Sequence, residues 1–126
     1  MPTPKDASWR QLKGQHYEHT ALHYLQQRGL SLLARNYRCK LGELDLVMRD
    51  RTMVVFVEVR FRARLQHGSP QETVNAAKQM RLRRAAQHFL QWHPPQRDAP
   101  CRFDVLALWP DIAGNLECLW IQAAFC

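Results

Sequence analysis

The chain has 126 residues, of which 46% are hydrophobic and 23% are charged, a balance typical of one globular domain and not of a disordered chain. No apolar run reaches the roughly 18 residues that a membrane span needs, and residues 1–8 lack a signal-peptide stretch, so we expect a cytoplasmic protein with no membrane partner. Its 18 Lys and Arg against 11 Asp and Glu give a net charge of +7, which favours nucleic acid as the partner over charge that serves solubility alone.

The first half of the chain predicts one helix and three strands. We expect residues 1–8 to be disordered. Ser8 and Gln11 have capping-box spacing, which predicts a helix from Ser8 to about residue 28 that ends at Gly29. Strands are expected over residues 30–38, 43–49 and 53–61, and a short polar turn at Asp50 and Arg51 joins the last two.

The second half predicts a loop, a helix and two strands. Residues 62–71 are basic and irregular, and we expect a flexible loop. Ser69, Pro70 and Glu72 are typical of a helix start, and this helix should reach about Trp92. A proline-rich loop over 93–100 and strands over 102–109 and 116–121 follow, with a turn at Gly114. The order α-β-β-β-α-β-β predicts an α/β fold, a mixed β-sheet flanked by helices, as one domain over residues 1–126.

An acid interrupts the most apolar strand. Glu58 stands inside the run VVFVEV, and an unpaired carboxylate buried there would cost several kcal/mol, so a cation or strong donor must lie nearby. If Arg51 and Thr52 form a two-residue turn, Asp45 lies directly opposite Glu58. A loop one residue longer would place the two acids on opposite faces. Two opposed carboxylates would need a cation beside or between them.

Each helix carries a charged residue on its core-facing stripe. These residues are Glu18 in the first helix and Lys78 in the second. Lys78 could instead extend outward to solvent, and an arginine could pair with Glu18. Converging acids and a lysine favour a site for Mg²⁺ or Mn²⁺. The alternative is a metal-free ion-pair cluster of Asp45, Glu58, Arg60 and Lys78.

Several of these segments together resemble one family of small bacterial proteins. The resemblance covers residues 14–109 and rests on GELDLV at 42–47, VFVEVR at 55–60, Lys78 with the Arg81-Leu82 and Ala85-Ala86 pairs, and RFDV at 102–105. These motifs are similar to those of the YraN family, whose members are regarded as endonucleases similar to Holliday-junction resolvases.

The resemblance implies a restriction-endonuclease-like fold of the PD-(D/E)xK nuclease superfamily. Asp45 and Glu58 would hold Mg²⁺ or Mn²⁺, and Glu18 matches the helical glutamate of the resolvase-like branch. Arg60 departs from the pattern, which has lysine at that position, and an arginine orients phosphate but does not shuttle protons. Either no shuttle is needed, or Lys78 takes that place, or the site is weak. The expected catalytic residues are Asp45, Glu58, Arg60 and Lys78.

Other polar residues have simpler interpretations. Arg60, Arg62, Arg64 and Arg81 are expected to contact phosphates, the alternative being a solvated basic loop. The histidines of the first helix predict a solvated polar face, and the four cysteines have no zinc-like spacing and are expected to be reduced.

We therefore expect a Mg²⁺-dependent endonuclease acting on DNA, with branched or structured DNA as one candidate substrate. Resolvases act as dimers, so a homodimer is a further expectation. The rivals are a nucleic-acid-binding module without turnover and an interaction protein with a purely structural acid cluster.

Overall fold

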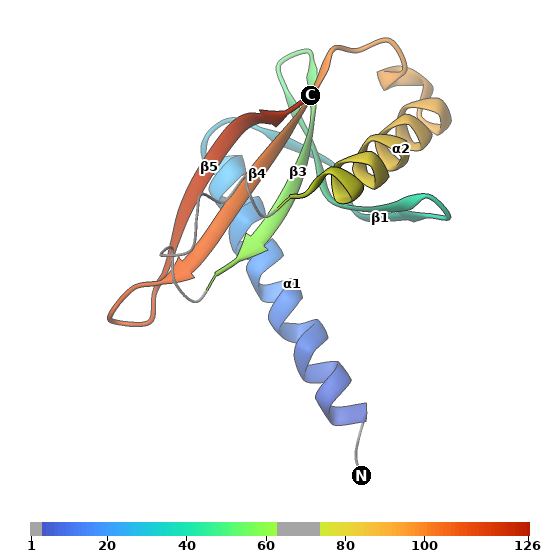
Figure 1. The fold of residues 1–126 in the computed structure, drawn as a ribbon. Helices are drawn as coiled ribbons and strands as arrows, with labels where there is room; N and C mark the ends of the chain where they lie inside the picture. Colours follow the sequence, from blue (N-terminus) through green and yellow to red (C-terminus); the bar gives the residue numbers. More distant parts are fainter. Residues whose placement is uncertain (1–3, 63–73) are drawn as a thin grey trace.

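The computed structural model describes residues 4–62 and 74–126, with side chains described from Gly14 onward. The first helix and three strands are followed by a second helix and two strands (Figure 1). The elements are α1 (Pro4–Gln27), β1 (Ser31–Cys39), β2 (Gly42–Asp50), β3 (Met53–Phe61), α2 (Ala76–Trp92), the 3-10 turn η2 (Pro94–Gln96), β4 (Cys101–Pro110) and β5 (Leu116–Phe125).

The strands form one mixed sheet in the order β1-β2-β3-β4-β5. Neighbouring strands are antiparallel except β3 and β4, which are parallel and are connected through α2. This arrangement confirms the α/β fold class and the predicted order of elements. Neither helix, within the described residues, has an apolar stretch that could cross a bilayer.

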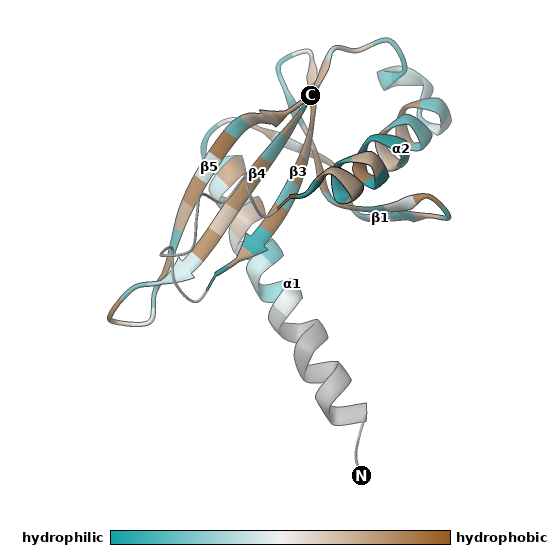
Figure 2. Ribbon diagram, in the orientation of Figure 1, coloured by the Kyte–Doolittle hydropathy of each residue, from teal (hydrophilic) through white to brown (hydrophobic). Residues whose placement is uncertain are grey.

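Each helix covers one face of the sheet. The α1 face packs Leu22 and Leu25 against strand residues such as Met48 and Leu106, whereas the α2 face packs Leu82 and Phe89 against others. Brown, hydrophobic segments run along the central strands between the helices, while much of the outer surface of α2 is teal (Figure 2). Because both faces are covered, the central strands are apolar on both sides, as parallel strands usually are.

Both helices begin elsewhere than predicted. Helix α1 begins at Pro4 and not at Ser8, whereas positions 1–3 lie outside the described residues. The expected disorder of residues 1–8 stays a prediction. Helix α2 begins at Ala76, because Asn75 is its N-cap and accepts a hydrogen bond from the Lys78 amide at 2.9 Å. The predicted start at residues 69–72, Arg64 and nearly all of the 62–71 loop lie outside the described residues.

The last strand is longer than predicted because a bulge interrupts it without ending it. The β4–β5 register shifts between Phe103 and Val105, and Ala123 adopts a left-handed φ of 50°. The Ala123 amide donates to Asp104 Oδ1 at 2.9 Å, which supplies the partner that the ladder lacks there. Strand β5 therefore continues beyond Ile121 to Phe125.

Candidate active site between β2 and β3

Strands β2 and β3 separate partway along their length. Their ladder runs from Asp50–Met53 to Leu46–Val57, which confirms the two-residue turn at Arg51 and Thr52. Beyond Leu46, β2 stays paired with β1, while β3 stays paired with β4. In Figure 1 the β1–β2 arm leads away under α2, apart from β3, β4 and β5. The first position past the split is Asp45 on β2 and Glu58 on β3.

The β1–β2 arm is distorted at the same level. Its register passes from Arg35–Leu46 to Tyr37–Leu44 and skips the pair formed by Asn36 and Asp45. Asn36 has a left-handed φ of 53°, a region that asparagine tolerates better than most residues. Leu46 packs on the α1 face, yet Leu44 packs on the α2 face, so the alternation of β2 breaks at Asp45. This irregularity turns the Asp45 carboxylate toward β3.

Asp45 and Glu58 interact directly across the split. Asp45 Oδ2 accepts a hydrogen bond from the Val59 amide at 2.9 Å, and its side chain is hydrogen-bonded to Glu58. Burial and then the negative charge of Glu58 raise the pKa of Asp45 from 3.8 to about 8. Near neutral pH the two acids, called here the carboxylate pair, therefore hold a proton between them.

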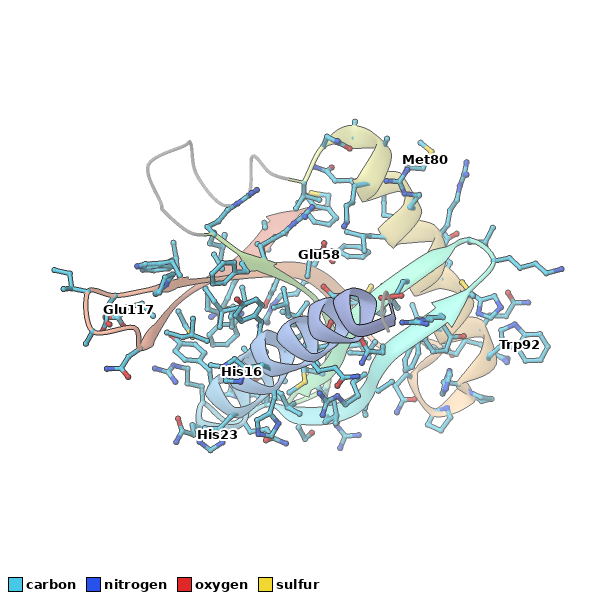
Figure 3. All side chains as sticks on the ribbon, turned by 90° about the horizontal axis from the view of Figure 1, so that it is seen from below. His16, His23, Glu58, Met80, Trp92 and Glu117 are labelled. Atoms are coloured by element: carbon cyan, nitrogen blue, oxygen red, sulfur yellow. The ribbon has the colours of Figure 1, made fainter. Side chains whose placement is uncertain are left out.

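Two cations lie beside Glu58, which is only 6% exposed. The Lys78 Nζ atom is 2.8 Å from Glu58 Oε2, and the Arg60 Nε atom is 3.4 Å from the same oxygen. Lys78 comes from α2 and Arg60 from β3, so the α2 side of the split is cationic. Both cations lie against Glu58, and it is the pKa of Asp45 that is raised, so the shared proton resides on Asp45. Figure 3 shows Glu58 near the middle of the molecule, with α2 traced from Met80 to Trp92.

Glu18 lies on the other side of the pair, on α1. Burial raises its pKa, while a hydrogen bond with Asn36 and the positive charge of Arg35 act in the opposite direction, and Glu43 and Glu58 add smaller upward contributions. The charge of Glu18 also contributes to the raised pKa of Asp45. Within residues 14–62 and 74–126, no three His, Cys, Asp or Glu side chains are grouped closely enough to hold a metal ion. A ligand role for Glu18 stays a prediction.

The expected phosphate-contacting arginines are placed only in part. Arg62 is half-buried, and its amide donates to the Leu108 carbonyl at 2.7 Å, just past the end of β3. Arg81 is exposed on α2. Arg64 lies outside the described residues. The histidines His16, His19 and His23 are exposed on α1, as the polar pattern predicted.

Sequence reasoning missed a second buried acid, Asp104, which is fully inaccessible. Its carboxylate accepts hydrogen bonds from Arg102 Nε at 3.0 Å, Trp120 Nε1 at 2.8 Å and the Ala123 amide at 2.9 Å. Arg102 also reaches Asp50 at 3.2 Å. The signal was available, since Asp104 interrupts an apolar strand just as Glu58 does. Both carboxylate oxygens of Asp104 have hydrogen-bond donors within the sheet, so its role is structural.

The chain matches the model of "Uncharacterised protein family UPF0102" over residues 17–108. It is 46% identical over 113 residues to a UPF0102 protein of Nitrosococcus oceani, covering 90% of each chain. It is 50% identical over 112 residues to a UPF0102 protein of Pseudomonas putida, covering 89% of this chain and 91% of that one. A UPF0102 protein of Nitrosomonas eutropha is 47% identical over 113 residues, which cover 90% of this chain and 92% of the other. The chain therefore belongs to the uncharacterised protein family UPF0102, the YraN family that its motifs resemble.

Proposed function

We propose that this protein is a metal-dependent endonuclease that hydrolyses phosphodiester bonds in DNA. The observation that supports this most directly is the carboxylate pair, two opposed acids at a split between strands with Lys78 and Arg60 beside them. A purely structural acid is normally surrounded by donors, as Asp104 is. Asp45 instead faces another acid, an arrangement that destabilises the fold and is typical of a functional site.

The carboxylate pair suits a hard divalent cation such as Mg²⁺ or Mn²⁺. Mg²⁺ is commonly held by one or two carboxylates and keeps several waters, so Asp45 and Glu58 would be sufficient ligands, and Glu18 would assist from α1. A bound cation would replace the proton that the pair shares. The metal would supply charge stabilisation for the phosphate and a water of lowered pKa.

The neighbouring residues would divide the remaining work. Arg60 carries a permanent charge that can orient a phosphate oxygen but cannot give up a proton at working pH. Lys78, whose amine lies 2.8 Å from Glu58, would contact the same phosphate and act in place of the lysine of the nuclease motif. The net charge of +7 and the exposed Arg81 support DNA as the substrate. The proposal also includes a branched or structured DNA as the substrate, a homodimer as the oligomeric state and the cytoplasm as the location.

The test is a cleavage assay in which each acid of the pair is neutralised. Asp45→Asn and Glu58→Gln should reduce Mg²⁺- or Mn²⁺-dependent cleavage of plasmid and oligonucleotide DNA to background, because each removes a ligand charge while keeping side-chain size. DNA binding measured without metal should be retained. Asp98→Asn and Glu117→Gln, exposed acids elsewhere, are matched controls that should cleave as the wild type does. Cleavage that persists in either pair variant would show that the activity belongs to a contaminant.

Arg60 favours one second candidate function. Because it occupies the position where the nuclease motif has lysine, the protein could bind nucleic acid in the same place without turnover. In that case the wild type would bind DNA with metal present and leave it intact. The Arg60→Lys variant, discussed below, separates these two functions.

A further inference from the structure

A polar groove lies between α1 and the middle of β1. It is lined by Gln15, His16, His19, Arg35 and Asn36, called here the His–Arg groove, and is a shallow hollow of about 510 Å³ that is largely open to solvent. All of these residues except Asn36 are exposed. Each lining side chain can donate hydrogen bonds, and none is acidic or apolar. A surface of this composition favours an anion over a cation or a hydrophobic group.

The groove adjoins the carboxylate pair through residues that belong to both. Asn36 lines the groove and stands at the level of Asp45 in the β1–β2 ladder, where the pair is skipped. Asn36 is also hydrogen-bonded to Glu18, which lies within electrostatic range of Asp45 and Glu58. The groove therefore begins where the carboxylate pair ends, on the opposite side from Lys78 and Arg60.

The histidines on α1 are not equivalent in this arrangement. His16 and His19 line the groove, whereas His23, one helical turn beyond His19, does not. If His16 and His19 formed only a solvated polar face, an arginine from another element would not be expected beside them. Arg35, from β1, lines the groove together with His16 and His19 and carries a permanent positive charge, which also acts on the neighbouring Glu18 carboxylate. A backbone phosphate fits a guanidinium with hydrogen-bond donors around it.

We infer that the His–Arg groove is a second phosphate-binding subsite, which holds the backbone of a nucleic-acid strand as it leaves the carboxylate pair along α1. The inference rests on the proposed function and extends it, since it specifies where the strand runs. One strand would then be contacted on both sides of the cleaved bond, by Lys78 and Arg60 on the α2 side and by Arg35 with the histidines on the α1 side.

The test measures DNA binding without metal at several salt concentrations, using a duplex and the corresponding single strand. Arg35→Ala should weaken binding roughly tenfold and reduce the slope of log K against log salt by about one, since one phosphate contact is lost. The double variant His16→Ala/His19→Ala should weaken binding several-fold, because each imidazole can donate a hydrogen bond to a phosphate oxygen. Arg49→Ala and His23→Ala are the matched controls, exposed residues of the same types outside the groove.

A second measurement does not depend on removing contacts. A photo-crosslinking amino acid in place of Gln15 should crosslink to bound DNA, whereas the same group in place of His23 should not. If groove and control variants bind alike and position 15 does not crosslink, the subsite is wrong although the wild type binds DNA. If the wild type itself fails to bind at low salt, the proposed function and the subsite both fall. Crosslinking at position 15, with weakened binding in Arg35→Ala alone among the arginine variants, supports the subsite.

Discussion

Asp45 is largely buried beside a second acid, which costs stability, and its carboxylate is a proposed metal ligand. It faces Glu58 from the end of the β2–β3 ladder, and the ion pairs of Lys78 and Arg60 are with Glu58. The contact that favours its charged form is the Val59 amide, and burial together with Glu58 outweighs that contact. Asp45 therefore keeps a proton at a pH where an ordinary aspartate has lost it. A phosphate-bound cation would offset the negative charge of Glu58, so Asp45 would then lose its proton.

This protonation gives stability a defined pH dependence. The folded protein holds a proton on Asp45 up to about pH 8, whereas the unfolded chain releases it near the ordinary pKa of 3.8. Between these values the folded state binds more protons, so the contribution of Asp45 to the free energy of unfolding falls as pH rises and levels off above about 8. Asp45→Asn does not titrate and should gain stability relative to the wild type as pH rises from 5 to 8.

Urea unfolding at half-unit pH steps measures this difference, and Asp98→Asn is the control because it is exposed. The difference between Asp98→Asn and the wild type should be flat over the same range. A difference between Asp45→Asn and the wild type that is also flat would mean that Asp45 is ionised throughout and that the pair shares no proton.

At the scale of elements, the start of α2 positions Lys78. Asn75 caps the helix by accepting from the Lys78 amide, and the Lys78 side chain then reaches back to Glu58. Helix phase predicted that Lys78 faces the core side, and the structure confirms it. The amine is one-third exposed, so it reaches both Glu58 and solvent, where a substrate phosphate would arrive.

Variants of Lys78 and Arg60 should separate enzyme from binding module. If the protein cleaves DNA, Lys78→Met should reduce the rate strongly, because Arg60 cannot supply or accept a proton. Arg60→Lys should preserve or raise the rate, since it restores the lysine of the nuclease motif. Lys40→Met, at the exposed tip of the β1–β2 hairpin, is the matched control. Single-turnover cleavage with saturating enzyme measures these rates without a contribution from binding. A wild type at background level, with activity gained only in Arg60→Lys, would favour the binding module.

The placement of α2 depends on a close approach at Gly42. A methyl group there would lie 3.0 Å from the Arg81 carbonyl oxygen and 3.6 Å from the Ala85 side chain. Gly42→Ala should therefore push α2 away from β2 and destabilise the fold by about 1–3 kcal/mol, the usual cost of overpacking. Because Lys78 lies on the same helix, cleavage should fall further than stability alone would cause.

Gly14→Ala, in α1 with nothing within 4 Å, should instead stabilise by up to about 1 kcal/mol. Thermal unfolding and the cleavage assay measure both effects, and equal stability of the two variants would contradict the close packing.

At the scale of the whole molecule, the site depends on two helices that reach one split in the sheet from opposite faces. The sequence predicted the acids because Glu58 interrupts an apolar strand and the two-residue turn sets the register opposite Asp45. It could not predict that the ladder ends there, at the level where Asn36 on a third strand has a left-handed backbone. Nor could it separate His16 and His19 from His23, since only the packing of α1 against β1 creates the groove.

Buried acids in this molecule are of two kinds, and a stability comparison should distinguish them. The two oxygens of Asp104 accept from Arg102, Trp120 and the Ala123 amide, so each oxygen faces a donor. In Asp104→Asn the amide NH₂ would face a donor in either orientation, and Arg102 would lose its buried countercharge. We expect a loss of about 3 kcal/mol or more in the free energy of unfolding, with the β4–β5 bulge loosened.

Asp45→Asn at pH 8 removes a repulsion and should be neutral or stabilising. Guanidinium unfolding of both variants, with hydrogen exchange at Ala123, measures these effects. Equal losses in the two variants would mean that the carboxylate pair is as structural as Asp104, and the endonuclease proposal would lose its main support.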